Sequence, residues 1–223
     1  MGLKESGLRG SLRNVSVGID AIPDTKNLHA EYAAFDLGLN DGEAVETWRD
    51  SFADNDLTGS GDVPTFNANE INGEPAVEFS TDDLLTVSFD PLPQPNTIYL
   101  VIKPDTPRSS DAFLDSLDES FQHQFQNQND EYSLQNELDG DPPSGGYDLI
   151  VGRFDTGNSL IRVNQSDVTG TISDESLEGL EVGAPNGDWS GNIAHILPYT
   201  TSHDTSTIEN VESYLNGFYD TLS

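Results

Sequence analysis

Short apolar runs separated by turn-forming residues dominate this chain from residue 76 to residue 198. Most runs are four to eight residues long and rich in β-branched and aromatic side chains, which is typical of strands. The expected strands cover residues 76–79, 84–89, 97–103, 112–117, 121–126, 131–134, 147–154, 159–163, 168–172, 180–183 and 191–198. Glycine, asparagine, aspartate and proline lie between them, and Asp155–Asn158 indicates a hairpin turn. The pattern predicts an all-β fold, an antiparallel β-sandwich.

Two segments have distinctive apolar patterns. Residues 97–103 are nearly continuously apolar, which predicts a central strand that is buried on both faces. At the other end of the domain, residues 206–209 fit a capping box. Apolar residues then follow at three- and four-residue steps: Ile208, Val211, Leu215, Phe218 and Leu222. This spacing predicts a C-terminal helix that packs one apolar stripe on the sandwich.

The charge is divided unevenly along the chain. The whole chain has 40 acidic and 9 basic residues, a net charge of −31. Residues 1–19 contain three bases and one acid, however, so 39 acids and 6 bases remain for the rest. Glycines interrupt the first segment, which predicts an extended arm and linker over 1–26 and one domain over 27–223.

A domain that is so acidic and so poor in lysine indicates a halophilic source, because molar salt screens the repulsion between its negative charges. The alternative is a metal-binding extracellular protein at ordinary salt. Nucleic acid is excluded as a partner of the domain, since phosphates attract positive surfaces. Without cysteines the chain has no disulfides and no thiolate metal site.

No run approaches the 18 apolar residues of a membrane span, so no membrane insertion is expected. The N-terminus has no apolar signal-peptide region, which predicts a protein made in the cytoplasm without a signal peptide. Asn14 and Asn164 begin glycosylation acceptor triplets, whose occupancy the sequence leaves open.

A set of ordered motifs resembles one superfamily over residues 28–220. The motifs are Val45-x-x-Trp48-x-Asp50, Asn72-Gly73-x-Pro75, Asp83-Leu84, Trp189-x-Gly191-x-Ile193-Ala194 and Val211-Glu-x-Tyr214-Leu215. This sequence resembles the concanavalin A-like lectin/glucanase superfamily, in its laminin-G-like branch, which implies a jelly roll. Trp48 and Trp189 belong to the structural part of that pattern and are expected in the core. The family pattern usually has glutamate after Ile-Ala, where this chain has His195.

The first nineteen residues carry a second resemblance. They are similar to N-terminal segments of tail-fibre-type virion proteins from tailed viruses of haloarchaea. The resemblance implies an adaptor that docks on other virion proteins through Leu3, Lys4, Leu8, Arg9, Leu12 and Arg13. It also implies a place at the virion surface. Because weak carbohydrate sites gain strength through multivalency, we expect a homo-oligomer, for which a trimer is favoured.

The carboxylates contain no strand motif suited to glycosidase chemistry. Glucanases of the superfamily use Glu-x-Asp-x-Glu, whose alternate residues share one face of a strand. The nearest segment is Glu137-Leu-Asp139-Gly-Asp141, followed by two prolines, which is typical of a loop. We therefore expect no enzyme. The same loop could bind calcium through Asp139 and Asp141, although no cofactor is required.

Amide side chains mark the candidate ligand site. On a strand over 121–126, Phe121, His123 and Phe125 would share one face and Gln122, Gln124 and Gln126 the other. Amides both donate and accept hydrogen bonds, which suits sugar hydroxyls, so these glutamines and Asn127 are candidate glycan ligands. A solvated face without function is the alternative.

The expected function is a virion fibre or spike protein that displays a lectin-like domain to a glycan or glycoprotein of the host surface. The alternatives are a decoration protein of the capsid or tail that binds no ligand, and a glycoside hydrolase.

Overall fold

A computed structural model describes residues 21–59, 61–105, 111–117, 124–128, 130–185 and 189–220. Within strands it gives the backbone but not the side chains of Asp111, Asn127 and Gln128. The predicted docking residues from Leu3 to Arg13, and the candidate ligand Gln122, lie outside the described residues.

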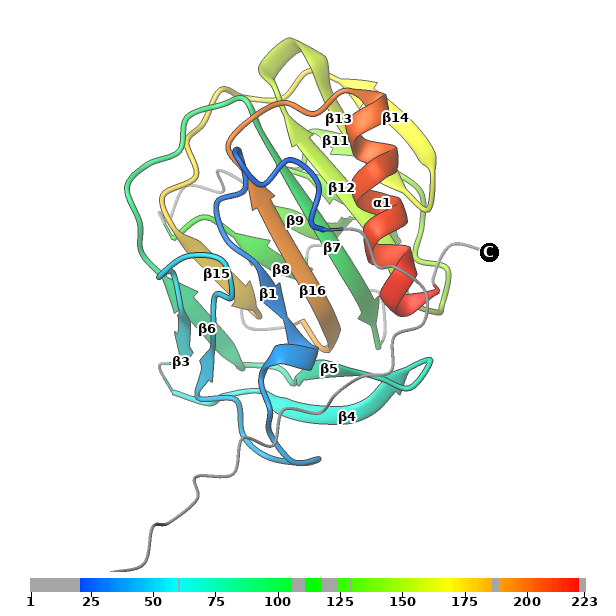
Figure 1. The fold of residues 1–223 in the computed structure, drawn as a ribbon. Coiled ribbons are helices and arrows are strands. Elements are labelled where there is room, and N and C mark those ends of the chain that lie inside the picture. The colour runs from blue at the N-terminus through cyan, green and yellow to red at the C-terminus, as the bar shows by residue number, and fades with distance from the viewer. Residues whose placement is uncertain are drawn as a thin grey trace, which may run out of the picture.

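The described strands form two sheets in which every pairing is antiparallel (Figure 1). Sheet A has the order β14-β13-β12-β7-β16-β5-β4, with β1 paired to β16. Its strands are β1 (Tyr32–Ala33), β4 (Thr65–Ile71), β5 (Glu74–Phe79), β7 (Asn96–Pro104), β12 (Asp148–Phe154), β13 (Ser159–Val163), β14 (Ser166–Gly170) and β16 (Gly191–Tyr199). Sheet A lies between the second sheet and the helix.

Sheet B has the order β11-β10-β9-β8-β15-β6-β3-β2. Its strands are β2 (Thr47–Trp48), β3 (Leu57–Gly59), β6 (Leu84–Val87), β8 (Asp111–Asp115), β9 (Phe125–Gln128), β10 (Glu131–Leu134), β11 (Leu138–Asp139) and β15 (Leu180–Gly183). Two short 3₁₀ helices, η1 (Ala34–Asp36) and η2 (Thr156–Asn158), complete the connections. The predicted all-β antiparallel jelly-roll sandwich with a C-terminal helix is confirmed.

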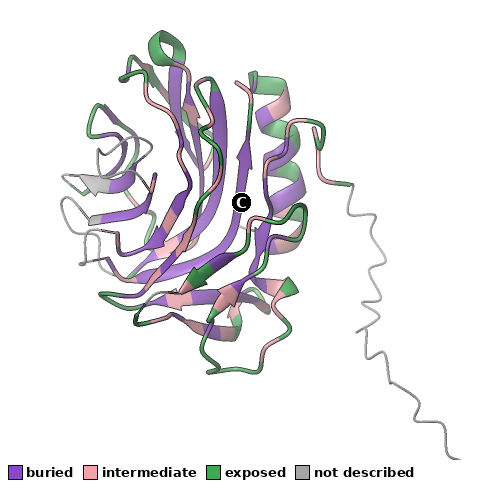
Figure 2. Ribbon diagram, turned by 90° about the vertical axis from the view of Figure 1, so that its left-hand side faces the viewer, coloured by how far each residue is buried: buried purple, intermediate pink, exposed green. Residues whose placement is uncertain are grey.

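The core lies between the two sheets, where the buried residues concentrate (Figure 2). Trp48 and Trp189 are both buried there, as predicted. Strand β7 pairs with β12 and β16, and all its residues except Lys103 are buried, which confirms the predicted central strand. Gly152 on β12 leaves room for Phe125 of the opposite sheet, because a Cβ at position 152 would overlap the phenyl ring.

Helix α1 (Thr205–Tyr219) packs on the outer face of sheet A. Ile208, Val211 and Leu215 are buried against that face, as the three- and four-residue spacing predicted, and Leu222 lies outside the described residues. The predicted capping box at residues 206–209 is wrong. Asp204 caps the helix instead, because its Oδ1 accepts a hydrogen bond of 2.8 Å from the Thr207 amide.

A buried ion pair joins α1 to sheet A. Arg162 on β13 donates from Nε and Nη2 to the Glu212 carboxylate at 2.8 and 3.1 Å, and from Nη1 to Asp167 at 2.6 Å. The Arg162 and Glu212 side chains are 8% and 4% exposed, so this bidentate pair is shielded from solvent. Burial acts to lower the pKa of Arg162, but the hydrogen bonds and charges of both carboxylates raise it above its ordinary value.

The sequence pattern missed five short or polar strands: β1, β2, β3, β4 and β11. Three of these have only two residues, and β4 carries Asn67, Asn69 and Glu70, which do not form an apolar strand pattern. The strand expected over 121–126 is described as β9 at 125–128, and residues 121–123 lie outside the described part.

The end of the predicted arm and linker contacts the sandwich. Ile22 packs on the apolar cluster beneath α1, and the Tyr199 hydroxyl donates to the Pro23 carbonyl at 3.0 Å. The Asp24 carboxylate lies 3.3 Å from Nε2 of His203. Among the described residues, no helix is long and apolar enough to cross a membrane.

Candidate functional site

Two of the predicted amide ligands lie on the outer face of sheet B. Gln126 on β9 is paired with Ser133 of β10 and Ala112 of β8, and Gln124 immediately precedes this strand. Phe125, between the two glutamines, is buried in the core on the opposite face. The predicted alternation is therefore present over 124–126. Asn127 continues the strand, but its side chain is not described.

The two glutamines belong to a chain of side-chain hydrogen bonds, which we call the amide network: Asp115, Gln124, Gln126 and Asn136. Gln126 donates to Asn136 Oδ1, and Asn136 Nδ2 donates to Gln124 Oε1 at 3.3 Å. Gln124 Nε2 then donates to Asp115 Oδ2 at 3.0 Å. Gln124 and Gln126 are buried, whereas Asn136 is exposed, so the network reaches solvent through Asn136.

A tight turn fixes Asn136 in this position. Gln135 and Asn136 have φ values of 54° and 58°, and the Glu137 amide donates to the Leu134 carbonyl at 2.9 Å, which defines a type I′ turn. The Gln135 amide also donates to the Gln124 carbonyl at 2.9 Å, which ties the turn to the residue before β9. Because asparagine tolerates positive φ, Asn136 suits this turn.

The Asn136 amide retains hydrogen-bonding capacity. Its Oδ1 accepts one hydrogen bond and its Nδ2 donates one within the network, so each atom can form one more. These two atoms offer an adjacent acceptor and donor on an exposed residue whose orientation is fixed by buried partners. Sequence reasoning missed both Asn136 and Asp115. The available signal was Gln135-Asn136 directly after the strand expected over 131–134, since asparagine favours turns with positive φ.

The predicted calcium residues lie at and just after β11. Asp139 on β11 and Asp141 are both exposed, and the Asp141 backbone carbonyl accepts from the Tyr132 amide at 3.2 Å. The structure describes no group of three or more His, Cys, Asp or Glu side chains that could hold a metal ion. Calcium at this pair stays a prediction, and its remaining ligands would have to be of other kinds, such as carbonyls or waters.

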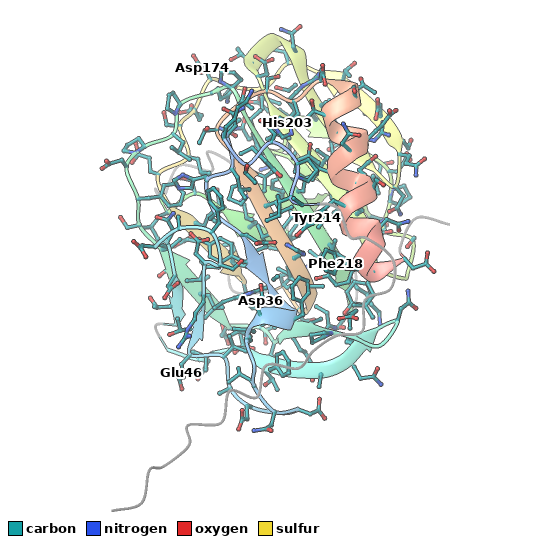
Figure 3. All side chains as sticks on the ribbon, viewed as in Figure 1. Asp36, Glu46, Asp174, His203, Tyr214 and Phe218 are labelled. Carbon is teal, nitrogen blue, oxygen red and sulfur yellow. The ribbon has the colours of Figure 1, made fainter. Side chains whose placement is uncertain are left out.

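Glu137, the first residue of the nearest glucanase-like segment, is held by Ser173. Its two carboxylate oxygens accept from the Ser173 amide and hydroxyl, both at 2.7 Å. One shallow cleft of about 290 Å³ lies elsewhere, along β2. Its lining is Leu37, Leu39, Ala44, Glu46, Thr47 and Arg49. Glu46, labelled in Figure 3, is the single carboxylate in that lining, whereas a glycosidase needs two carboxyl groups across the bond.

His195 occupies the position where the family pattern has glutamate, and it is fully buried. Its Nε2 lies 3.2 Å from Glu31 Oε1, and its Nδ1 lies 3.2 Å from the Tyr219 hydroxyl. Because that hydroxyl donates to the Ala194 carbonyl at 3.1 Å and Glu31 can only accept when ionised, both ring nitrogens are placed to donate. His195 therefore links Glu31 to Tyr219 through both of its ring nitrogens.

Further donors complete the environment of Glu31. The Tyr214 hydroxyl, which extends from α1 over sheet A in Figure 3, donates to Oε1 at 3.1 Å, and Ser51 donates to Oε2 at 2.7 Å. Burial acts to raise the pKa of Glu31, but the hydrogen bond and electrostatic effect of His195, with the hydrogen bonds from Ser51 and Tyr214, lower it overall. The cluster thus joins β1, β16 and α1 inside the protein and has a structural role.

Asn164, one of the two glycosylation acceptor positions, uses its side chain inside the fold. Its Nδ2 donates to Asp148 Oδ1 at 2.6 Å, and its Oδ1 accepts from the Leu149 amide at 2.9 Å. Asp148 also accepts from the Tyr132 hydroxyl at 2.8 Å. A glycan attached at Asn164 Nδ2 would therefore disturb a buried hydrogen-bond network. Asn14 lies outside the described residues.

Solved structures with the same fold include several sugar-associated proteins. Domain 4 of AbnA, an extracellular GH43 arabinanase from Geobacillus stearothermophilus solved with arabinotriose, has a TM-score of 0.62 at 13% identity, covering 83% of this chain and 98% of that domain. The binding domain of botulinum neurotoxin DC, in complex with rat synaptotagmin II, has a TM-score of 0.64 at 11% identity, covering 89% and 53%. Trypanosoma rangeli sialidase, in complex with sialic acid, has a TM-score of 0.55 at 11% identity, covering 92% and 35%.

These likenesses establish the fold. The chain spans nearly all of the arabinanase domain but about half of the neurotoxin binding domain and a third of the sialidase. No family model matches the sequence, and no curated protein matches it.

Proposed function

We propose that the jelly roll is a carbohydrate-binding domain and that Asn136 faces the sugar. The observation that carries the proposal is the exposed Asn136 amide, held by the buried Gln124 and Gln126, with one donor and one acceptor unused by the residues that the structure describes. Adjacent hydroxyls of a sugar ring can donate to that acceptor and accept from that donor. Solved neighbours that include an arabinotriose-bound domain and a sialic acid-bound sialidase support the ligand class.

The network favours binding because it lowers the cost of fixing the ligand-facing group. An isolated exposed asparagine would lose rotamer freedom on binding, whereas here two buried amides already orient it. A single such contact gives a weak site, which gains strength when several copies are displayed together. A homo-oligomer, with a trimer favoured, is therefore part of the proposal.

Replacing Asn136 by alanine is expected to weaken glycan binding about tenfold or more. It removes two hydrogen bonds to the sugar, each contributing about 0.5–1.5 kcal/mol, and leaves the ends of the Gln124 and Gln126 amides without their partner. Binding of the purified protein to host envelope glycans, on a glycan array and by titration calorimetry at high salt, measures the effect. Asn69→Ala is the matched control, since Asn69 is an exposed asparagine on the other sheet.

The same assay separates the alternatives. Equal binding of Asn136→Ala and the unchanged protein would contradict the proposed site, and binding that requires calcium and is lost in Asp139→Asn would support the Asp139–Asp141 pair. Glycan turnover that disappears in Glu137→Gln would indicate a glycoside hydrolase. No glycan binding by the unchanged protein would leave a decoration protein as the better interpretation.

We further propose that this domain is displayed on the virion of a halophilic virus and that residues 1–19 dock it to other virion proteins. The support is the change in charge near residue 20, from a segment with three bases and one acid to an acidic body, together with the resemblance to tail-fibre-type proteins. A basic arm that packs against an acidic virion protein is covered by that protein. The acidic body, in contrast, is adapted to a surface exposed to salt.

Deleting residues 1–19 is expected to reduce incorporation into particles to background while the jelly roll remains folded. The arm supplies the docking contacts, whereas the described core lies entirely in residues 21–220. Quantitative immunoblotting of purified particles measures incorporation, and circular dichroism at molar salt checks folding. Normal incorporation of the shortened protein would overturn the docking proposal.

A further inference from the structure

A second polar site lies on the outer face of sheet A, beside the part that α1 covers. Strand pairing places Glu78 of β5 opposite Asn192 of β16, and Asn192 opposite Lys103 of β7. Tyr147, just before β12, continues the row, since the neighbouring Asp148 pairs with Ile102. We call Glu78, Asn192, Lys103 and Tyr147 the Asn192 row. It crosses four adjacent strands, a span of roughly 14 Å at ordinary strand spacing.

The row contains two buried polar atoms without partners. Asn192 is only 4% exposed, yet its Oδ1 has no hydrogen-bond partner in the described structure, and neither has the buried Tyr147 hydroxyl. Each such atom costs about 1–3 kcal/mol unless something pairs with it. Burial raises the pKa of Tyr147 most, and the nearby Glu70, Asp105 and Glu78 carboxylates raise it further. The Tyr147 hydroxyl therefore remains a donor.

A weak ion pair borders these atoms. Lys103 Nζ lies 3.5 Å from the Glu70 carboxylate and 5.7 Å from the centre of the Tyr147 ring. The two charged side chains are 34% and 29% exposed, and an ion pair of this kind contributes little to stability, so a ligand can displace it at small cost. Hydrogen bonds to Asn192 and Tyr147 would more than offset that loss.

The groups in the row select a neutral polyhydroxylated ligand. Lys103 and Tyr147 donate, while Asn192 Oδ1 and the Glu78 carboxylate accept, as does the adjacent Glu70. The carboxylates would repel an anion, whereas hydroxyl groups can both accept from Lys103 and Tyr147 and donate to the acceptors. We propose that the Asn192 row is a second carbohydrate subsite that takes a neutral sugar residue. The ligand class rests on the proposed function, but the site itself rests on these contacts.

The test measures binding of arabinotriose and of a library of neutral oligosaccharides to the full chain at high salt, with Asn136→Ala as the background. In that background Asn192→Leu or Tyr147→Phe is expected to reduce the remaining binding at least tenfold, and Asn69→Leu is expected to leave it unchanged. Urea unfolding of the same variants reports whether the fold is retained.

Each outcome separates the second subsite from the proposed function. Unchanged binding in Asn192→Leu, with higher stability because an unpaired amide is gone, would overturn the subsite and indicate a site filled by water. Loss of all binding in Asn136→Ala alone would also overturn the second subsite and would support the amide network as the ligand site. Loss of binding in Asn192→Leu, with no effect of Asn136→Ala, would support the Asn192 row and overturn the proposed contact of Asn136 with the sugar. Failure of the unchanged protein to bind any saccharide would overturn both.

Discussion

Replacing Glu212 by alanine is expected to lower the free energy of unfolding by about 3–5 kcal/mol, because it leaves the buried Arg162 charge without its bidentate partner. Asp167 still contacts Nη1, but its side chain is 38% exposed and cannot pair with Nε and Nη2. The loss should appear in urea unfolding curves recorded at one fixed molar salt concentration, where the midpoint falls and the slope stays constant.

Two further variants show whether the charge causes the effect. Glu209→Ala removes an exposed carboxylate from the same helix and should change the stability by less than about 0.5 kcal/mol. The double variant Arg162→Met/Glu212→Leu should recover most of the loss, because an apolar pair of similar size has no charge to bury. A loss below about 1 kcal/mol in Glu212→Ala would show that solvent reaches Arg162.

The substitution His195→Glu is expected to destabilise the fold by about 3–5 kcal/mol. The change would place a second carboxylate beside Glu31 in a fully buried position, where two like charges have no solvent to separate them. Thermal unfolding followed by circular dichroism measures the loss as a lower Tm. The neutral variant His195→Gln, which keeps a donor, should lose less.

Exchanging the two partners tests the interpretation directly. In the double variant Glu31→His/His195→Glu an imidazole and a carboxylate again face each other, so most of the stability should return. Tyr214 and Tyr219 then retain a polar partner, although at exchanged positions. No recovery in the exchanged pair would mean that the exact hydrogen-bond geometry, rather than the pairing of an imidazole with a carboxylate, stabilises this junction.

The sequence predicted those strands and the helix whose apolar residues follow a regular spacing. The continuous apolar run of 97–103 indicated β7 because a strand buried on both faces has no polar residues to alternate. The spacing of Ile208, Val211 and Leu215 indicated α1 because one helix face meets the sheet. The sequence pattern did not predict β4, because this strand lies at an edge of sheet A, where Asn67, Asn69 and Glu70 are tolerated.

The candidate sites depend on contacts that no local pattern contains. Gln124 and Gln126 were found as amides on one face, but their burial comes from partners on other segments, including Asn136 in the next turn. Glu31 and His195 lie 164 positions apart, so their pairing could be known only from the fold. The Asn192 row likewise forms across β5, β16 and β7, which are far apart in sequence.

The position of β16 in sheet A sets the order in which the chain can fold as it leaves the ribosome. Strand β16 lies between β5 and β7, so the β4–β5 hairpin cannot join the β7–β12–β13–β14 half-sheet until residues 191–199 have been synthesised. Helix α1 follows only then, and until that moment the apolar outer face of β7 and β12 has no cover. Nearly the whole domain must therefore be translated before its two halves close, so the nascent chain exposes apolar surface over most of its synthesis.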